Sequence, residues 1–231
     1  MFSHEETAGA TGRFPLSQST IYTSTTLRCI VSCMSDSYHH GSLRRAVLDR
    51  ALQIIAAEGA EHLSIRSIAA DLGVSHTAPR HHFGTRKELL STIAAEGFAV
   101  LGQKLAAVRE SGAPFLDAGS AYVAFALTHP AYFRVMFAPD LLDDNSAELR
   151  VARDAAFAEL RFGVDEMTGE AGGEDAAVAV IAGWAIAHGI AQLAGSGNLD
   201  RARLQPLVAD GDIATIARRA MGMLYGSPER G

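Results

Sequence analysis

Polar and cationic side chains gather between residues 75 and 87, and they are the groups in this sequence best suited to do chemistry. They are hydrogen-bond donors and cations of the kind that contact phosphate oxygens and base edges in DNA. A helix facing only a hydrophobic core would carry more apolar bulk at these positions. The candidates for nucleic-acid contact, with one solvent-facing arginine upstream, are Arg66, Ser75, His76, Thr77, Arg80, His81, His82, Arg86 and Lys87.

Two short helices joined by a tight turn are predicted to position these side chains. Ser64 can cap the first helix, in which apolar residues recur at helical spacing as far as Leu72. Gly73 can adopt the left-handed conformation that closes a helix, and Ser75 can cap the next one. Because Pro79 has no N–H, it favours a tight first turn of 3₁₀ character. This pattern is typical of a helix-turn-helix.

A longer helix is predicted on each side of this motif. The first covers residues 43–58, presents one apolar face and stops at Gly59. The second opens at a capping box of Thr85 and Glu88 and continues to about residue 109.

The stretch GVSHTAPRHHFGTRKELL resembles the DNA-binding signature of the TetR family of transcriptional regulators, and the preceding YHHGSLRRAVLDRALQIIAAEGAEHLSIRSIA extends the match. The resemblance runs from Tyr38 to about Phe98. It implies an all-α protein with an N-terminal three-helix DNA-binding domain and a helical-bundle domain that dimerises and binds an effector. Arg80 departs from the tyrosine usual in the family, which makes the operator sequence unpredictable by analogy.

The resemblance also suggests roles for single residues, several of which have an alternative. Arg86 aligns with the family's phosphate-binding lysine, although an ordinary solvated charge is the other interpretation. His82 either contacts a phosphate or packs the recognition helix. The arm that contains His39 and His40 either lies beside the DNA or is frayed.

Beyond residue 113 the composition changes, and aromatic residues concentrate in 121–142. This part resembles the effector domain of a TetR branch that later shows a Trp and then His-Gly, here Trp184, His188 and Gly189. Such an aromatic face forms either plain core or the lining of a cavity for a small apolar or aromatic effector. His188 is equally consistent with a core histidine. The candidate effector-binding residues are Tyr122, Phe125, Phe133, Met136, Phe137, Phe157, Trp184 and His188.

Two C-terminal helices, 175–193 and 212–224, are expected to form the four-helix dimer interface that the family uses, with burial inside one monomer as the alternative. The first is rich in small apolar residues, and we expect it to be too short and too broken to span a membrane. The domain organisation predicted is a tail or mis-annotated extension (1–36, with Met34 as the expected start), a helix-turn-helix domain (37–84), a connecting helix (85–112) and an effector and dimerisation domain (113–231).

The formal net charge is −6, but it is unevenly distributed. Residues 37–98 hold seven Arg and Lys and six Asp and Glu, whereas residues 99–231 hold eleven Arg and Lys and seventeen Asp and Glu. Six of the nine histidines also lie in residues 37–98. This asymmetry suits a DNA reader whose partner is double-stranded operator DNA.

The sequence offers no sign of catalysis or of a cofactor. The C-terminal half has no G-x-S-x-G, phosphate loop or metal-ligand spacing, and Cys29 and Cys33 cannot complete a zinc site alone. We expect a cytoplasmic, non-enzymatic, homodimeric repressor without cofactor or metal. The alternative is a helical ligand-binding or scaffold protein whose helix-turn-helix contacts protein.

Overall fold

The computed structural model describes residues 42–168, 174–204 and 212–225, all within one compact unit. Over these ranges the chain forms helices and no strand, so the predicted all-α class is confirmed. The arm with His39 and His40 and the expected start at Met34 lie outside them. The N-terminal helices are residues 42–57, η1 (Ala60–His62), α2 (Ile65–Asp71), η2 (Pro79–His81) and α3 (Arg86–Glu110). The C-terminal helices are α4 (Leu116–Thr128), α5 (Pro130–Met136), η3 (Pro139–Leu141), α6 (Ala147–Thr168), α7 (Glu174–Gly195), α8 (Asn198–Arg201) and α9 (Ile213–Tyr225).

Local signals in the sequence correspond to the observed helix ends. Ser64 accepts a hydrogen bond from the Ser67 amide at the start of α2. Thr85 accepts one from the Glu88 amide (3.1 Å), which is the cap bond of the predicted capping box, whereas the Glu88 carboxylate accepts from the Gly84 amide (3.1 Å), one residue before the expected Thr85 amide. These bonds satisfy backbone donors that a helix leaves without internal partners.

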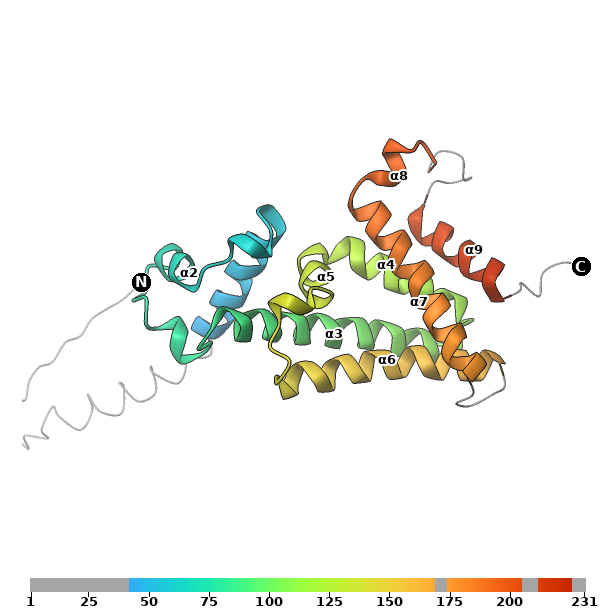
Figure 1. Cartoon of the computed structure of the whole chain (residues 1–231), viewed down its shortest axis with the longest axis horizontal. Helices are drawn as coiled ribbons and strands as arrows, with labels where there is room; N and C mark the ends of the chain where they lie inside the picture. The colour runs from blue at the N-terminus through green and yellow to red at the C-terminus, as the bar shows by residue number, and fades with distance from the viewer. Residues whose placement is uncertain (1–41, 169–173, 205–211, 226–231) are drawn as a thin grey trace, which may run out of the picture. The chain divides into compact units, whose positions relative to one another are not determined.

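Helix α3 is the central element of the structure. It packs against α4, α5 and α6, and α3 and α6 lie side by side along most of their length (Figure 1). Ten of its residues are buried, from Leu89 near its start to Leu105. A Cβ on Gly97 would come within 2.6 Å of Met136 Sδ, so the missing side chain allows α5 to approach α3 closely. Helix α3 therefore connects the helix-turn-helix to the C-terminal bundle.

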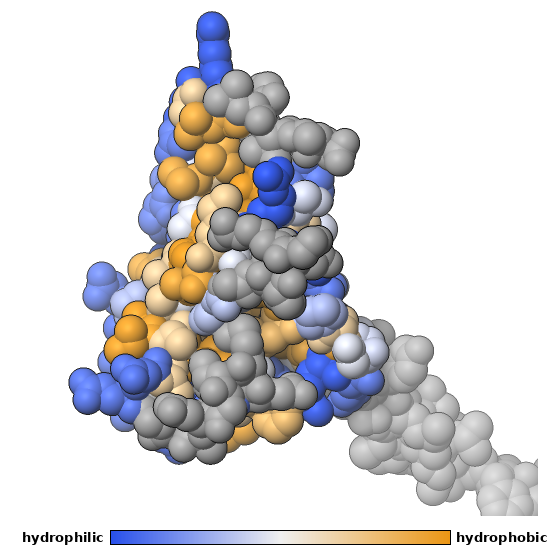
Figure 2. Space-filling view, turned by 90° about the vertical axis from the view of Figure 1, so that its right-hand side faces the viewer, coloured by the Kyte–Doolittle hydropathy of each residue, from blue (hydrophilic) through white to orange (hydrophobic). Residues whose placement is uncertain are grey.

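Helices α7 and α9 expose an apolar band, which we define as Val178, Ile181, Leu193, Met223 and Leu224. Hydrophobic side chains gather on the face of the molecule that carries these helices (Figure 2). On its inner side α9 is held by an Arg218–Asp117 ion pair and by a Tyr225 hydroxyl that donates to the Ala179 carbonyl (2.6 Å). The side chains of the apolar band thus remain exposed after α7 and α9 have packed within one chain.

The expectation that the α7 segment is too short to span a membrane is wrong. Its 22 residues reach about 33 Å at 1.5 Å per residue, which is enough for a hydrocarbon core of about 30 Å. In length and composition α7 passes as a membrane span, and 22% of its apolar window is buried. A single helix of this kind is weak evidence for a membrane protein, because the core helix of a soluble protein passes the same test of length and composition.

Candidate DNA-binding surface and effector pocket

The turn of the helix-turn-helix is built by local backbone bonds. Gly73 has φ +65°, and the amides of Gly73 and Val74 donate to the carbonyls of Ala70 and Ala69 (3.1 and 3.0 Å). This is the Schellman arrangement, in which a left-handed residue closes the helix. The prediction for Gly73 is confirmed, and α2 ends where the chain must turn toward the recognition segment.

The recognition segment is a series of tight turns that ends in η2. Amides of residues 78, 80, 81 and 82 each donate to the carbonyl three residues earlier, at 3.0–3.3 Å. Pro79 is buried and has no N–H, so it cannot make the bond four residues back that an α-helix requires. The expected 3₁₀ character is observed. Ser75, however, is not the cap that the sequence predicted, because η2 begins at Pro79 after Ala78 and has no side-chain cap bond. The Ser75 hydroxyl lies 3.1 Å from the Thr77 hydroxyl.

Most of the candidate DNA-contacting side chains lie at the surface. His82 and Arg86 are half-buried, and the others within the described residues are exposed: Arg66, Ser75, His76, Thr77, Arg80, His81 and Lys87. This arrangement presents hydroxyls, imidazoles and cations along one segment of chain. It is suited to contact both phosphates and base edges.

Arg86 has a second role that the sequence did not indicate. Its guanidinium donates to the carbonyl of Ala60, 26 residues away, at 2.6 Å. That carbonyl belongs to η1, so Arg86 ties the loop after the first helix to the start of α3. A phosphate contact by Arg86 would have to use its remaining N–H groups. The neighbouring Lys87 is exposed and is the better candidate for a phosphate contact.

The C-terminal bundle contains a pocket of about 500 Å³, within the range of small-molecule sites. Five of the eight predicted effector residues line it: Met136, Phe137, Phe157, Trp184 and His188. Five lining residues were not predicted: Phe98, Pro139, Arg153, Ile181 and Ala185. Arg153 lies one helical turn before Phe157 and so on the same face of the helix, and this spacing could have identified it as a lining residue from the sequence.

The remaining three predicted effector residues do not line this pocket, although Phe133 and Tyr122 contact residues that do. Phe133 is buried, and its ring centroid lies 5.2 Å from those of both Phe137 and His188. Phe125 is buried against His129. Tyr122 is buried too, and its hydroxyl reaches the pocket residues Trp184 and His188.

Burial and a short hydrogen-bond network together determine the protonation and the tautomer of His188. Trp184 Nε1 donates to the Tyr122 hydroxyl (3.2 Å), which in turn lies 2.8 Å from His188 Nδ1. Burial raises the pKa of Tyr122 and lowers the pKa of His188, so the phenol keeps its proton and the imidazole is neutral. The Gln192 side-chain nitrogen, which can only donate, lies 3.4 Å from His188 Nε2, so we infer that Nε2 accepts. The proton of the neutral ring is then on Nδ1, which donates to the Tyr122 hydroxyl oxygen.

The neutral state of His188 leads to a prediction about pH. An unfolded histidine titrates near pH 6.5, whereas the folded His188 takes up its proton only at lower pH. The contribution of neutral His188 to stability is therefore complete above pH 6.5, the pKa of an unfolded histidine. It is lost as the pH falls from there toward the lower pKa of the folded His188. Thermal unfolding scans between about pH 7.5 and about pH 5.5 should show a steeper loss in the wild type than in His188→Gln. His62→Gln, a change at an exposed histidine, should behave as the wild type; equal slopes in all three proteins would contradict the assignment.

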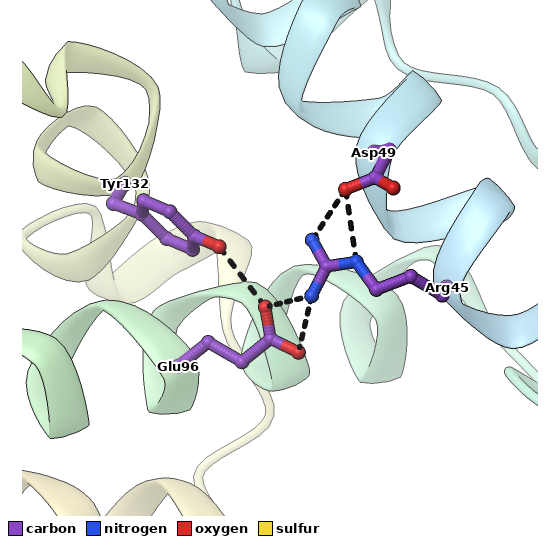
Figure 3. Close-up of polar contacts among 4 residues, drawn as sticks. All are labelled: Arg45, Asp49, Glu96 and Tyr132. Atoms are coloured by element: carbon purple, nitrogen blue, oxygen red, sulfur yellow. Dashed lines mark hydrogen bonds and ion pairs between the residues drawn. The ribbon is translucent and has the colours of Figure 1, made fainter.

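A side chain of α5 is linked through α3 to the helix of residues 42–57 (Figure 3). The Tyr132 hydroxyl donates to Glu96 on α3 (3.0 Å), and Glu96 accepts from Arg45 on the helix of residues 42–57 (3.2 Å). Arg45 also donates to Asp49 (2.9 Å), and this bond is the main cause of its raised pKa. The Arg45 guanidinium thus lies between two carboxylates, and one of them, Glu96, also accepts from the Tyr132 phenol.

Arg134 makes a second link from α5. Its guanidinium donates to the carbonyls of Ile55 (3.0 Å) and Ala56 (3.4 Å), in the last turn of the helix of residues 42–57. Carbonyls at this end of a helix carry partial negative charge, so a cation here is stabilising. Since Met136 lies two residues later in α5 and lines the pocket, α5 contacts both the pocket and the helix of residues 42–57.

Comparisons with known proteins agree with the helical fold. Residues 115–224 match the family model "Tetracyclin repressor-like, C-terminal domain". A protein of unknown function from Rhodococcus sp. RHA1 is 34% identical with a TM-score of 0.63, over 80% of this chain and 95% of its own. The TetR family transcriptional regulator PfmR from Thermus thermophilus has 21% identity and a TM-score of 0.59, over 80% and 99% of the two chains. A tetR-family regulatory protein from Rhodococcus RHA1 has 21% identity and a TM-score of 0.56, over 79% and 94%. The search of curated proteins found no significant match.

Proposed function

Because this chain belongs to the TetR family of transcriptional regulators, we propose that it is a cytoplasmic, homodimeric repressor of a pseudo-palindromic operator that a small apolar or aromatic effector releases. One observation carries the proposal: α5 and the residue after it line the pocket through Met136 and Phe137, and α5 is bonded to the helix of residues 42–57 directly through Arg134 and by way of Glu96 through Tyr132. A ligand that moves α5 would therefore act on the DNA-binding helices directly.

The exposed recognition segment supports operator binding. Arg80 can contact a phosphate or hydrogen-bond a guanine with two N–H groups, and His76 and Thr77 can contact base edges. In a twofold dimer the two segments must lie about 34–36 Å apart to enter successive major grooves. Effector binding would favour a dimer with a different spacing, and the DNA affinity would fall by the coupling free energy, typically about 1–3 kcal/mol.

The direct test is binding of the full chain to the intergenic DNA beside its own gene, with shuffled DNA of equal length as control. Sequence-selective binding that weakens steeply with salt is the expected result, because phosphate contacts release counterions. Equal, weak and salt-insensitive binding to both duplexes would favour the alternative function, a helical scaffold whose helix-turn-helix contacts protein. Turnover of a bound ligand would contradict the proposed absence of catalysis.

Lys87 provides a sharper form of this test. It is exposed at the start of α3, and replacing it by alanine should remove one phosphate contact. Binding should then weaken about equally on all DNA sequences, and the salt slope should fall by about 0.9. Lys104→Ala, at an exposed lysine farther along α3, is the matched control and should leave the slope unchanged. The same slope in Lys87→Ala and the wild type would exclude a phosphate contact.

The proposed dimer rests on the apolar band of α7 and α9. Met223 is 83% exposed there, and an aspartate in its place would be desolvated in the interface without a partner. Sedimentation equilibrium should show the dimer of Met223→Asp to be at least about tenfold weaker, equivalent to about 1.4 kcal/mol. Val151→Asp, at a residue of α6 that is 66% exposed and outside the band, should leave the dimer intact. A monomeric wild type, or an intact Met223→Asp dimer, would refute this interface.

A further inference from the structure

The charges around the pocket indicate what kind of molecule it can hold. Eight of the ten lining residues are apolar or aromatic, and the other two are Arg153 and His188. None of the described lining residues is an aspartate or a glutamate. The lining therefore combines a large apolar surface with one permanent positive charge.

Arg153 is not committed to another partner in the described part of the chain. The ion pairs formed there use other cations, namely Arg45, Arg50, His62, Arg109 and Arg218. By contrast, Arg134 and Arg86 are bound to backbone carbonyls. Arg153 is exposed on α6 at the edge of the pocket, with its guanidinium donors available to a ligand.

His188 is the other polar residue of the lining. Its Nδ1 lies 2.8 Å from the Tyr122 hydroxyl, and its Nε2 lies 3.4 Å from the Gln192 side-chain nitrogen, so both ring nitrogens have protein partners. Among the described lining residues, Arg153 therefore supplies the donors left for an oxygen acceptor on the ligand. Nothing described in the lining offers a negative charge to a ligand ammonium group.

We propose that the effector is an amphipathic organic carboxylate, whose carboxylate binds Arg153 and whose aliphatic or aromatic body fills the pocket between Phe98, Phe157 and Trp184. This inference rests on the proposed effector function of the pocket. It specifies that the ligand is negatively charged, which the apolar part of the lining alone does not indicate. An arginine suits a carboxylate because two parallel N–H groups match its two oxygens.

Trp184 is the one tryptophan of the chain and lines the pocket, so its fluorescence reports on occupancy. We suggest titrating the full chain with decanoate and with decan-1-ol, which share a chain length and differ in charge. Decanoate should bind about fivefold more tightly, as expected for a charge-assisted contact that remains partly exposed to water. Arg153→Gln should remove this preference without weakening decanol binding. Arg161→Gln, at an exposed arginine on α6 outside the lining, should retain it.

The outcomes separate this inference from the proposed function. Equal binding of both probes, with no effect of Arg153→Gln, would overturn the carboxylate assignment and leave the pocket as an effector site. No change in Trp184 fluorescence with either probe would overturn the carboxylate assignment and weaken the pocket's proposed role. Operator binding, measured on the same protein, is independent of both results.

Discussion

Replacing Arg134 by methionine should abolish most of the influence of an effector on DNA binding. Arg134 joins α5, which lines the pocket, to the last turn of the helix of residues 42–57 through the Ile55 and Ala56 carbonyls. Methionine keeps an unbranched apolar stem and removes the charge and the donors. A coupling of about 1–3 kcal/mol in the wild type corresponds to a change of about 5- to 150-fold in DNA affinity. In the variant we expect this change to shrink to within about threefold.

The measurement is the operator dissociation constant with and without a ligand that quenches Trp184. Arg150→Met, a change of an exposed arginine on α6, is the matched control and should keep the full response. Amide exchange gives a test that needs no ligand: the backbone bonds from Glu58 and Gly59, which close the same helix end, should be less protected in Arg134→Met. A full ligand response in the variant would show that the coupling runs elsewhere.

Replacing Phe98 by alanine should cause the largest loss of stability among the changes considered. Phe98 is 2% exposed on α3, and its ring centroid lies 5.6 Å from that of Phe137 and 6.3 Å from that of Phe157. Truncation removes buried apolar area and leaves a cavity that opens into the pocket, a loss of about 3–5 kcal/mol in the free energy of unfolding. Urea unfolding at one fixed protein concentration measures this, since dimerisation would make the midpoint depend on concentration.

Phe162 offers a matched control for this substitution. It lies on α6, is 52% exposed and contacts the Arg109 guanidinium at 5.3 Å from its ring centroid. Phe162→Ala should cost less than about 1 kcal/mol, since a surface side chain contributes little burial and an exposed cation–π contact is weak. Similar losses in the two variants would mean that Phe98 is not part of a cooperative core.

The local structure of the helix-turn-helix was predictable from the sequence because its interactions span only a few residues. Ser64 caps α2 through an amide three residues away, and Thr85 caps α3 through the Glu88 amide over the same distance. Gly73 and Pro79 act through their own backbone conformations, which residue type restricts directly. The family resemblance rests on the same short stretch, so family and fold class were also available before the structure.

The contacts between residues far apart in the sequence were decided by the tertiary structure. Arg86 reaches a carbonyl 26 residues away, Tyr132 reaches Glu96 across 36 residues, and Arg134 reaches Ile55 across 79. No pattern of spacing within one helix predicts such pairs, because they depend on which faces α3 and α5 turn toward each other. The pocket has the same origin: it lies where side chains of α3, α5, α6 and α7 leave space, so the sequence indicated Phe137, Phe157 and Trp184 but neither Phe98 nor Arg153.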